Sequence, residues 1–242
     1  MNRIKDWRRT TRTTSVALAA LALLLSAGGC LPAGPITEEG PPRVRMQTSL
    51  GEFVIELNDE ESPLSVENFL CYVEDGFYTG TLLHRVIPNF VIQGGGYTPG
   101  LIEKTDTRGP IVNESRNGLR NEQLTVAMAR TLDPDSARSQ FFINLVDNPS
   151  LDATLDRQGY AVFGRIIDGQ AVVSAIGIAE TQDVNGFEDV PVTDIVITGT
   201  VIEPGEERIT PEWEAYLADL EFRGLSALRE IALSVLQNAL LN

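Results

Sequence analysis

Two adjacent residues that could do chemistry, His84 and Arg85, lie in the largely apolar stretch LLHRVIPNFVIQGGG, residues 82–96. His84 is the only histidine of the chain, and histidine is the side chain that most often acts as a general base near neutral pH. Arg85 keeps its charge at every accessible pH, so it donates hydrogen bonds without exchanging protons. The pair therefore offers two chemistries: proton transfer by His84, or stabilisation of developing charge by Arg85.

Other chemistries find little support in the sequence. A hydrolase is disfavoured because His84 has no nucleophile and no acid at motif spacing. The glycine run 94–96 is not followed by a helix that carries a phosphate-binding lysine, so tight backbone packing is the better interpretation. Asp133, Asp135 and Asp147 do not form a twelve-residue calcium loop, which makes them solvated loop acids. We therefore expect no metal and no cofactor.

The elements that must position this stretch are mostly short strands. Residues 43–57, RVRMQTSLGEFVIEL, form two alternating runs around a turn, which predicts a hairpin. Helical spacing of apolar residues predicts a helix that begins at Pro63 and stops at Gly76. A second short helix is predicted at DGQAVVSAIG, residues 168–177. The remaining strands are predicted at LLHRVI, FVIQG, LTVAMA, QFFINLV, YAVFGRI and VTDIVITGTVI.

Many short strands with turn residues between them, and only two helices, predict a mainly β fold in which an antiparallel sheet closes into a barrel. A closed barrel also leaves no sheet edge exposed. We assign this domain to residues 43–203, which are enough to bury a core of their own.

Several separated motifs then agree on one family. FYTGTLLHRVIPNFVIQGGGYT, NGLRN, LTVAMART, SARSQFFINLVDNPSLD and YAVFGRIIDGQAVVSAI together resemble the cyclophilin family of peptidyl-prolyl cis-trans isomerases, and its bacterial periplasmic branch most. The resemblance covers residues 43 to about 202. It implies an eight-stranded antiparallel barrel capped by two helices. It also implies catalysed isomerisation of X-Pro bonds in proline-containing polypeptides, during the folding of exported proteins.

The resemblance also assigns roles to residues at matching motif positions. Arg85 corresponds to the catalytic arginine and Gln93 to the glutamine that orients it. The proline pocket would be lined by Phe90, Val91, Phe142, Leu151 and Tyr160, and the neighbouring peptide groove by Met128, Ala129, Arg130 and Gln140. The sequence departs from many relatives at Ser150, where they have tryptophan, and at Tyr160, where they have histidine. These departures leave sensitivity to the family's inhibitor cyclosporin open, but not catalysis.

The chemistry of such a reaction fits the residue types. Rotation about a peptide bond is opposed by a barrier of about 18–20 kcal/mol because resonance gives the C–N bond double-bond character. A catalyst of this rotation needs no nucleophile and no proton transfer, but it must bind the twisted state better than either planar state. A fixed donor to the proline nitrogen does this. We therefore expect Arg85 to be the catalyst and His84 to be a structural, hydrogen-bonded residue.

The first thirty residues indicate export. A basic segment, residues 1–12, is followed by an apolar run, residues 15–27, and by the ending LSAGGC. The run is shorter than the about 20 residues that span a bilayer. The ending resembles a bacterial lipobox, so we expect residues 1–29 to be a lipoprotein signal peptide and Cys30 to be lipidated. Ordinary cleavage nearby remains the alternative, and the choice between Sec and twin-arginine export stays open.

These features predict a lipoprotein of the bacterial cell envelope that faces the periplasm. The outer membrane is slightly favoured, because Leu31 is not the aspartate that would suggest retention in the inner membrane. Removal of residues 1–29 takes away five basic residues and one acidic residue, which leaves 14 Lys and Arg against 33 Asp and Glu, a net charge of −19. Such a chain is repelled by phosphate backbones, so nucleic acid is not expected as a partner. Attachment to the membrane must come from acyl chains on Cys30.

The segments that flank the predicted barrel have other roles. Residues 30–42 are rich in proline and glycine and are predicted to be an extended tether after the lipidated cysteine. Residues 204–242 are predicted to be a helical extension, with an apolar stripe over residues 211–241 and Gly224 between its halves. The stripe could pack on the barrel, mediate self-association or dock to an envelope partner. A partner would suit the alternative function, a low-turnover chaperone or scaffold lipoprotein that holds proline-containing segments.

Overall fold

The structure is a computed structural model that describes residues 37–205, 207–222, 224–226, 229–230 and 233. The predicted signal peptide and Cys30 therefore lie outside the described residues. Two compact units are distinguished: residues 41–204, and a second unit formed by the segments before and after them.

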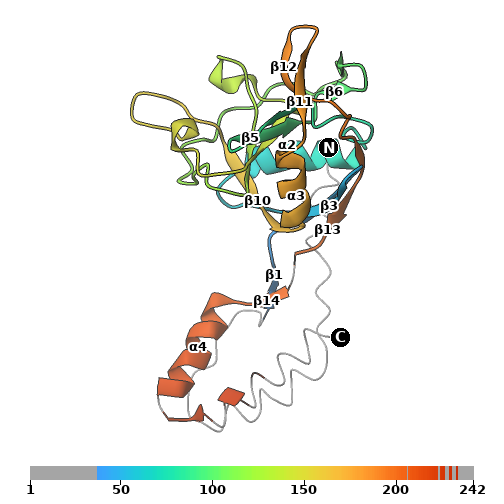
Figure 1. The fold of residues 1–242 in the computed structure, drawn as a ribbon. Coiled ribbons are helices and arrows are strands. Elements are labelled where there is room, and N and C mark those ends of the chain that lie inside the picture. The colour runs from blue at the N-terminus through green and yellow to red at the C-terminus, as the bar shows by residue number, and fades with distance from the viewer. Residues whose placement is uncertain (1–36, 206, 223, 227–228, 231–232, 234–242) are drawn as a thin grey trace. The chain divides into compact units, whose positions relative to one another are not determined.

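An eight-stranded antiparallel sheet forms the centre of the 41–204 unit (Figure 1). The predicted hairpin at residues 43–57 is confirmed, with its strands joined by a turn at Ser49 and Leu50. Strand β2 buries alternate side chains, as a sheet with one face on a core requires, whereas β3 buries Phe53, Val54 and Ile55 in succession. The strand order is β13-β2-β3-β10-β8-β9-β5-β4. The strands span Arg43–Thr48 (β2), Gly51–Leu57 (β3), Arg85–Ile87 (β4), Val91–Gly94 (β5), Thr125–Met128 (β8), Phe141–Asn144 (β9), Val162–Asp168 (β10) and Ile197–Glu203 (β13).

The predicted closure of the barrel is wrong, because the sheet is open between β4 and β13, its two edge strands. Residues just before β4 approach the start of β13 through one isolated antiparallel bridge, Leu82 to Val196. The Leu83 N–H also donates to the Ile195 carbonyl at 2.9 Å. β4 begins only at Arg85, three residues later than the predicted strand, so no continuous ladder joins the edges.

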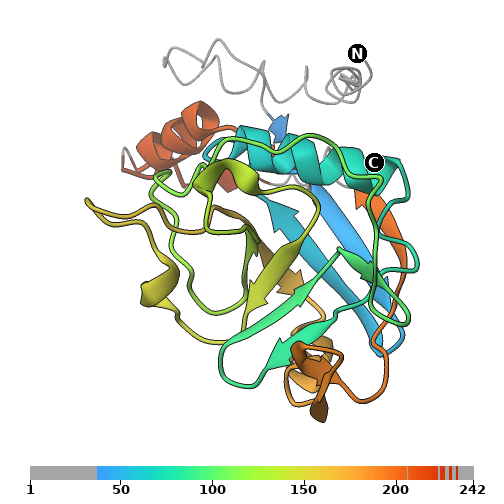
Figure 2. The same ribbon diagram turned by 90° about the horizontal axis from the view of Figure 1, so that it is seen from above.

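Both predicted helices of the barrel are present (Figure 2). Helix α2 spans Pro63–Glu74, with proline in its first turn, and Gly76 follows it at φ 64°, a conformation that glycine adopts without strain. Helix α3 spans Gln170–Gly177. Figure 2 shows α2 across one end of the open barrel and α3 at the other.

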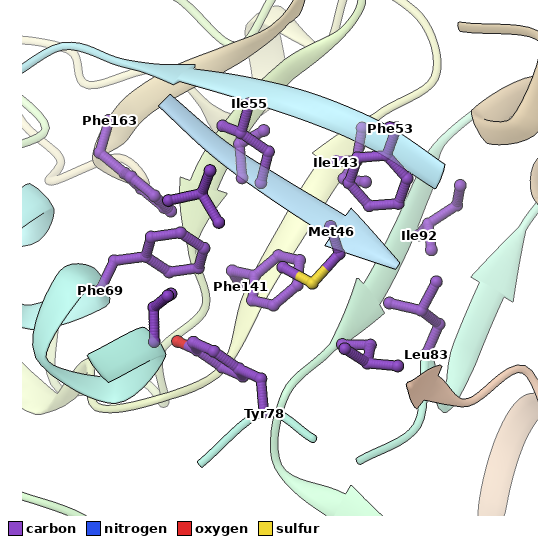
Figure 3. Packing of buried hydrophobic residues seen from close by; sticks show 14 of the residues in the cluster. Met46, Phe53, Ile55, Phe69, Tyr78, Leu83, Ile92, Phe141, Ile143 and Phe163 are labelled. Carbon is purple, nitrogen blue, oxygen red and sulfur yellow. The ribbon is translucent and has the colours of Figure 1, made fainter. Parts of the chain in front are cut away.

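The apolar core fills the interior of the barrel (Figure 3). Phe69 of α2 meets Phe141 of β9 in an edge-to-face contact, with ring centroids 5.7 Å apart. Met46, Phe53 and Ile55 contribute from the first hairpin. Helix α2 is therefore held by burial of its aromatic face, which is the largest stabilising contribution available to an amphipathic helix.

Two small hairpins and two 3-10 helices lie outside the eight-stranded sheet. Strands β6 (Tyr97–Thr98) and β7 (Ile102–Glu103) form one hairpin, and β11 (Thr181–Val184) and β12 (Phe187–Pro191) form the other. The 3-10 helices η1 and η2 span Pro134–Ser136 and Pro149–Leu151. The sequence analysis predicted neither hairpin.

The second unit contains a two-stranded sheet and a helix. Strand β1 (Thr37–Glu39) pairs with β14 (Glu207–Ile209), so residues 37–39 of the predicted tether are a strand rather than free chain. Helix α4 spans Pro211–Phe222 and buries Trp213, Tyr216 and Leu217 among others.

The end of α4 agrees with the predicted break in the tail. Gly224 has φ 74°, its N–H donates to the Glu221 carbonyl, and the Leu225 N–H donates to the Leu220 carbonyl. These are the two bonds of a Schellman stop. Most of the predicted second half of the tail lies outside the described residues. In the described part of the chain, no helix has the length and apolar character needed to cross a bilayer.

Candidate active site

A row of directly opposed residues crosses five strands of the sheet. Arg85 on β4 is the cross-strand partner of Gln93 on β5, and Gln93 is the partner of Phe142 on β9. Phe142 in turn opposes Ala127 on β8, which opposes Val162 on β10. Opposed residues of antiparallel strands project from the same face. The register alone therefore places the guanidinium, the amide and an apolar surface side by side.

The apolar part of this row belongs to a patch separate from the barrel core. Its buried members are Val91, Ala127, Phe142 and Val162, and its half-buried members are Phe90, Leu119, Ala129, Leu151 and Tyr160. We call this set the apolar patch. All five residues that the resemblance assigned to a proline pocket are in it. Half-buried aromatic and aliphatic side chains beside a cation are what a proline ring next to a polar peptide bond would contact.

Gln93 does not hydrogen-bond to Arg85 in this structure. Its Nε2 donates to Oε1 of Gln140 at 2.9 Å. Gly96 allows this arrangement, since a Cβ at that position would come within 2.5 Å of the Gln140 amide nitrogen. The glycine run 94–96 thus serves close packing, as the sequence analysis predicted. Gly95, the middle residue, also has φ 82°.

Tyr160 is held in the apolar patch from two sides. Its ring meets Phe142 edge-on with centroids 5.5 Å apart, and the guanidinium carbon of Arg130 lies 4.4 Å from its ring centroid. Arg130 also donates to the carbonyls of Gln158 and Gly159 at 3.0 and 3.1 Å. Arg130 therefore fixes the loop that carries Tyr160, whereas the resemblance implied a role for it in a peptide groove.

Two further residues predicted for the groove are engaged within the fold. The Met128 side chain is buried in the barrel core, and its N–H donates to the Ala161 carbonyl at 3.0 Å. The Ala129 N–H donates to the Gln140 carbonyl at 2.9 Å. Neither N–H is available to an added peptide strand in this state.

Two connections bring the outer members of the patch into place. Asn89, at φ 58°, forms the turn before Phe90, and the Phe90 carbonyl accepts from the amide of Leu145 at 2.9 Å and from Nδ2 of Asn148 at 3.0 Å. On the other side, the Tyr160 N–H donates to the Leu151 carbonyl at 2.9 Å. Short polar contacts thus position the rings of Phe90 and Tyr160 in the apolar patch.

His84 is buried away from solvent, as a structural residue should be. Its ring contacts Tyr97 edge-on with centroids 4.7 Å apart. Burial lowers the pKa of His84 to about 4, with a smaller opposing effect from the Leu82 backbone and a smaller lowering effect from Arg85. The predicted hydrogen bonding is incomplete, because Nδ1 has no hydrogen-bond partner among the described residues. A neutral, buried imidazole is a poor general base at pH 7.

Sequence reasoning missed Asp189, a contact of Arg85. Asp189 Oδ2 lies 3.5 Å from Arg85 Nη2, and both side chains are about one third exposed. It also missed Ala127 and Val162, because small or aliphatic strand residues are core residues by default. In the strand LTVAMA, alternation places the side chain of Ala127 on the opposite face of the sheet from Val126 and Met128. This alternation could have identified Ala127 as a residue of the site.

The remaining chemistry-bearing residues form no second centre. Within residues 37–205 and the described parts of the tail, no three His, Cys, Asp or Glu side chains gather as metal ligands. Cys71 on α2 is half-buried, and burial raises the pKa of its thiol. It is therefore a poor nucleophile.

Comparison with known proteins agrees with this geometry. The family model for cyclophilin-type peptidyl-prolyl cis-trans isomerases matches residues 43–202. A peptidyl-prolyl cis-trans isomerase of Streptomyces antibioticus is 54% identical over 162 residues, 66% of this chain and 97% of the relative. Peptidyl-prolyl cis-trans isomerase A of Dickeya dadantii is 44% identical over 185 residues, 76% of this chain and 96% of the relative.

Solved structures give the same result. The crystal structure of a cyclophilin-type isomerase from Cryptosporidium parvum has a TM-score of 0.56 and 26% sequence identity, and the match covers 66% of this chain and 96% of that one. That protein has also been crystallised in the presence of the dipeptide Ala-Pro. With the family model spanning the whole barrel and relatives matched over nearly their full length, the chain belongs to the family of cyclophilin-type peptidyl-prolyl cis-trans isomerases.

Proposed function

We propose that this peptidyl-prolyl cis-trans isomerase works by stabilising the twisted X-Pro bond with Arg85 while the apolar patch holds the proline ring. The single observation that carries the proposal is the cross-strand row. It sets Arg85 two strands from Phe142, with Gln93 between them. A proline ring seated on Phe142 would then have its nitrogen directed toward the guanidinium.

The physical argument concerns how charge changes during rotation. In either planar state the proline nitrogen shares its lone pair with the carbonyl and is a poor acceptor. In the twisted state the lone pair returns to nitrogen and can accept a hydrogen bond. A donor placed there stabilises the transition state more than the ground states, which is the condition for raising kcat. Arg85 keeps its charge across the physiological pH range, so it needs no protonation step.

The surroundings of the row are apolar and suit the ring of a proline. Tyr160 and Phe142 meet edge-on, and Leu151 packs against the buried members of the apolar patch. The contacts that fix these side chains come from Arg130 and from backbone groups of the same loop. A patch held from outside needs little reordering when substrate binds, which favours turnover.

The test is a protease-free proline-isomerisation assay on residues 31–242 and on the Arg85→Ala variant. Loss of one transition-state donor lowers kcat by about 10²–10³-fold in other enzymes, and we expect a loss of that order. Arg165→Ala is the matched control, because Arg165 is an exposed arginine that pairs with Glu56 on the sheet's surface. Wild-type turnover by Arg85→Ala would contradict the mechanism. Peptide binding without turnover by the unmodified chain would favour the alternative, a holding module.

We propose further that the enzyme is an envelope lipoprotein that acts on exported proteins. The support is the sequence alone: the basic and apolar leader and the LSAGGC ending. Cys30→Ser should prevent acylation and move the protein from the membrane fraction into a soluble or unprocessed pool. If the variant is processed normally and still sediments with membranes, the proposed anchor is wrong.

A further inference from the structure

We propose that Asp189 is a positioning residue that holds Arg85 for catalysis; the inference rests on the role of Arg85 proposed above. The guanidinium of Arg85 meets the Asp189 carboxylate at 3.5 Å. Gln93, the residue expected to orient Arg85, instead directs its amide to Gln140. Among the described residues, Asp189 is therefore the polar partner of this guanidinium.

The backbone around Asp189 is shaped to aim its side chain. The register of the β11–β12 hairpin shifts between Gln182 and Val184, so that Asp183 faces two residues of β12. Asp189 lies in this bulge at φ 59°, a conformation uncommon outside glycine but tolerated by aspartate. Its N–H donates to Oδ1 of Asp183 at 3.3 Å. Bulges beside active sites commonly redirect a side chain, and this bulge directs a carboxylate to Arg85.

The hairpin itself is anchored beside β4. Asn185 and Gly186, at φ 52° and 87°, make the two-residue turn that matches the twist of a hairpin. Phe187, the next residue, contacts Tyr97 edge-on with centroids 5.1 Å apart. β12 lies alongside β4, the edge strand that carries Arg85, and Figure 1 shows the hairpin rising from the barrel beside this end of the sheet. Asp189 is thus presented by an anchored element.

The chemical need for such a residue follows from arginine itself. A half-exposed arginine has many rotamers, and any that point away from the substrate are unproductive. A carboxylate contacting Nη2 restricts these rotamers and leaves the other donors of the guanidinium for the proline nitrogen. Both partners are about one third exposed, so solvent screens the pair and its contribution is modest. We expect its loss to lower kcat about two- to fivefold, far less than loss of Arg85.

The experiment is a double-mutant cycle on the chain of residues 31–242. Asp189→Gly removes the carboxylate and relieves the positive φ, so the bulge is retained. Asp189→Asn keeps the shape and one acceptor oxygen. Glu188→Gln is the matched control, because it removes one negative charge from the exposed neighbouring position of the same strand. Each variant is combined with Arg85 and with Arg85→Ala, and kcat and KM are measured separately with folding checked by thermal unfolding.

The inference predicts that Asp189→Gly lowers kcat two- to fivefold, on the order estimated for a half-exposed pair, with little change in KM. The decrease in kcat should be smaller for Asp189→Asn and absent for Glu188→Gln. The effect of Asp189→Gly on kcat should vanish when Arg85 is replaced by alanine. A second readout needs no turnover: the order parameter of the Arg85 Nε–H group, measured by NMR, should fall in Asp189→Gly.

Three results would overturn the role of Asp189: an unchanged kcat and order parameter in Asp189→Gly, the same loss of kcat in the Arg85→Ala background, or an equal loss in Glu188→Gln. In each case Arg85→Ala still separates the two proposals. If Arg85→Ala alone keeps wild-type turnover, the catalytic mechanism fails first. If Arg85→Ala is impaired and Asp189→Gly is not, only the positioning role of Asp189 is wrong.

Discussion

At the scale of single residues, the neighbours His84 and Arg85 have different environments, in keeping with the different roles that the sequence predicts for them. His84 is buried and keeps a pKa of about 4, so it is neutral across the working pH range. Arg85 is partly exposed and lies on the same face as Gln93 and Phe142. The proposed mechanism uses a permanent donor rather than a titrating one, which is why it assigns catalysis to the arginine.

The pKa of His84 makes a prediction for stability against acid. The folded value, about 4, lies below the ordinary value of 6.5 because the ring is buried. The unfolded chain therefore binds more protons between these two values, and stability is complete above pH 6.5 and lost as the pH falls toward 4. The loss amounts to at most about 3 kcal/mol. Urea unfolding of His84→Gln between pH 7 and 4.5 should show a correspondingly shallower decline than the unmodified chain.

Comparing how steeply the free energy of unfolding falls with pH in the two chains removes the destabilisation that glutamine itself causes at a buried site. Equal declines in the two chains would show that His84 does not contribute to the acid dependence of stability.

The isomerisation rate of the unmodified chain should stay nearly flat from pH 6 to 8, since no group of the mechanism titrates there. A rate that followed one ionisation near ~6.5 and lost this dependence in His84→Gln would give the catalytic role to His84.

At the scale of elements, the register between strands builds the site. A slip of one residue between β5 and β9 would turn Gln93 and Phe142 to opposite faces. Gly94 lets β5 approach the chain before β4 closely, because a Cβ on Gly94 would come within 2.5 Å of the Leu83 side chain. Gly96 has the more specific role, since it leaves room for the side chain of Gln140.

Gly96→Ala should therefore impair function more than stability. The added methyl group displaces the end of Gln140, a side chain that can move, and so breaks its 2.9 Å bond with Gln93. We expect stability to change by less than about 1 kcal/mol and kcat/KM to fall several-fold. Chemical denaturation and the isomerase assay measure the two quantities. Gly169→Ala is the contrasting variant, because its Cβ would meet the backbone of Glu52 and Phe53 and should destabilise the fold strongly.

The elements also show what the sequence could and could not predict. Both barrel helices and the first hairpin were predictable, because proline, glycine and strict alternation mark their bounds. The β11–β12 hairpin was missed although Asn185-Gly186 between apolar residues is a strong hairpin signal. The open edge of the sheet could not be predicted, because it depends on how residues 81–83 meet residues 195–197, which are distant in sequence and form one bridge and a few backbone bonds instead of a ladder.

The candidate site was likewise only partly predictable from the sequence. Arg85, Phe90, Gln93 and Phe142 were assigned by motif, and the structure brings them to one face. Asp189 belongs to no sequence motif, since its proposed role depends on a bulge and on an ion pair with a residue distant in sequence. The engaged N–H groups of Met128 and Ala129 were equally invisible, because hydrogen-bond partners follow from register and not from residue type.

At the scale of the whole molecule, the chain separates into a compact barrel unit, residues 41–204, and a second unit that includes α4. Every residue placed in the cross-strand row or the apolar patch lies in the first unit. The family match ends at residue 202 as well. Catalysis should therefore not require the second unit.

Residues 41–204 alone should retain the isomerase activity of residues 31–242. Any self-association of the longer chain, measured by light scattering, should disappear on truncation, because the apolar residues of α4 are then absent. Activity is compared at equal concentrations of folded protein, with circular dichroism as the check on the barrel. Loss of activity by a folded 41–204 chain would mean that the tail takes part in the site.

The central claim is that Arg85 acts on the twisted state and not on binding. NMR line-shape analysis of an Ala-Pro peptide on the enzyme tests it most directly, because it gives the interconversion rate of the bound isomers and their dissociation constants together. For Arg85→Ala, the account predicts that the on-enzyme rate falls by about 10²-fold or more, while the affinities for the cis and trans peptide change only a few-fold. An unchanged on-enzyme rate with a large loss of affinity would contradict it.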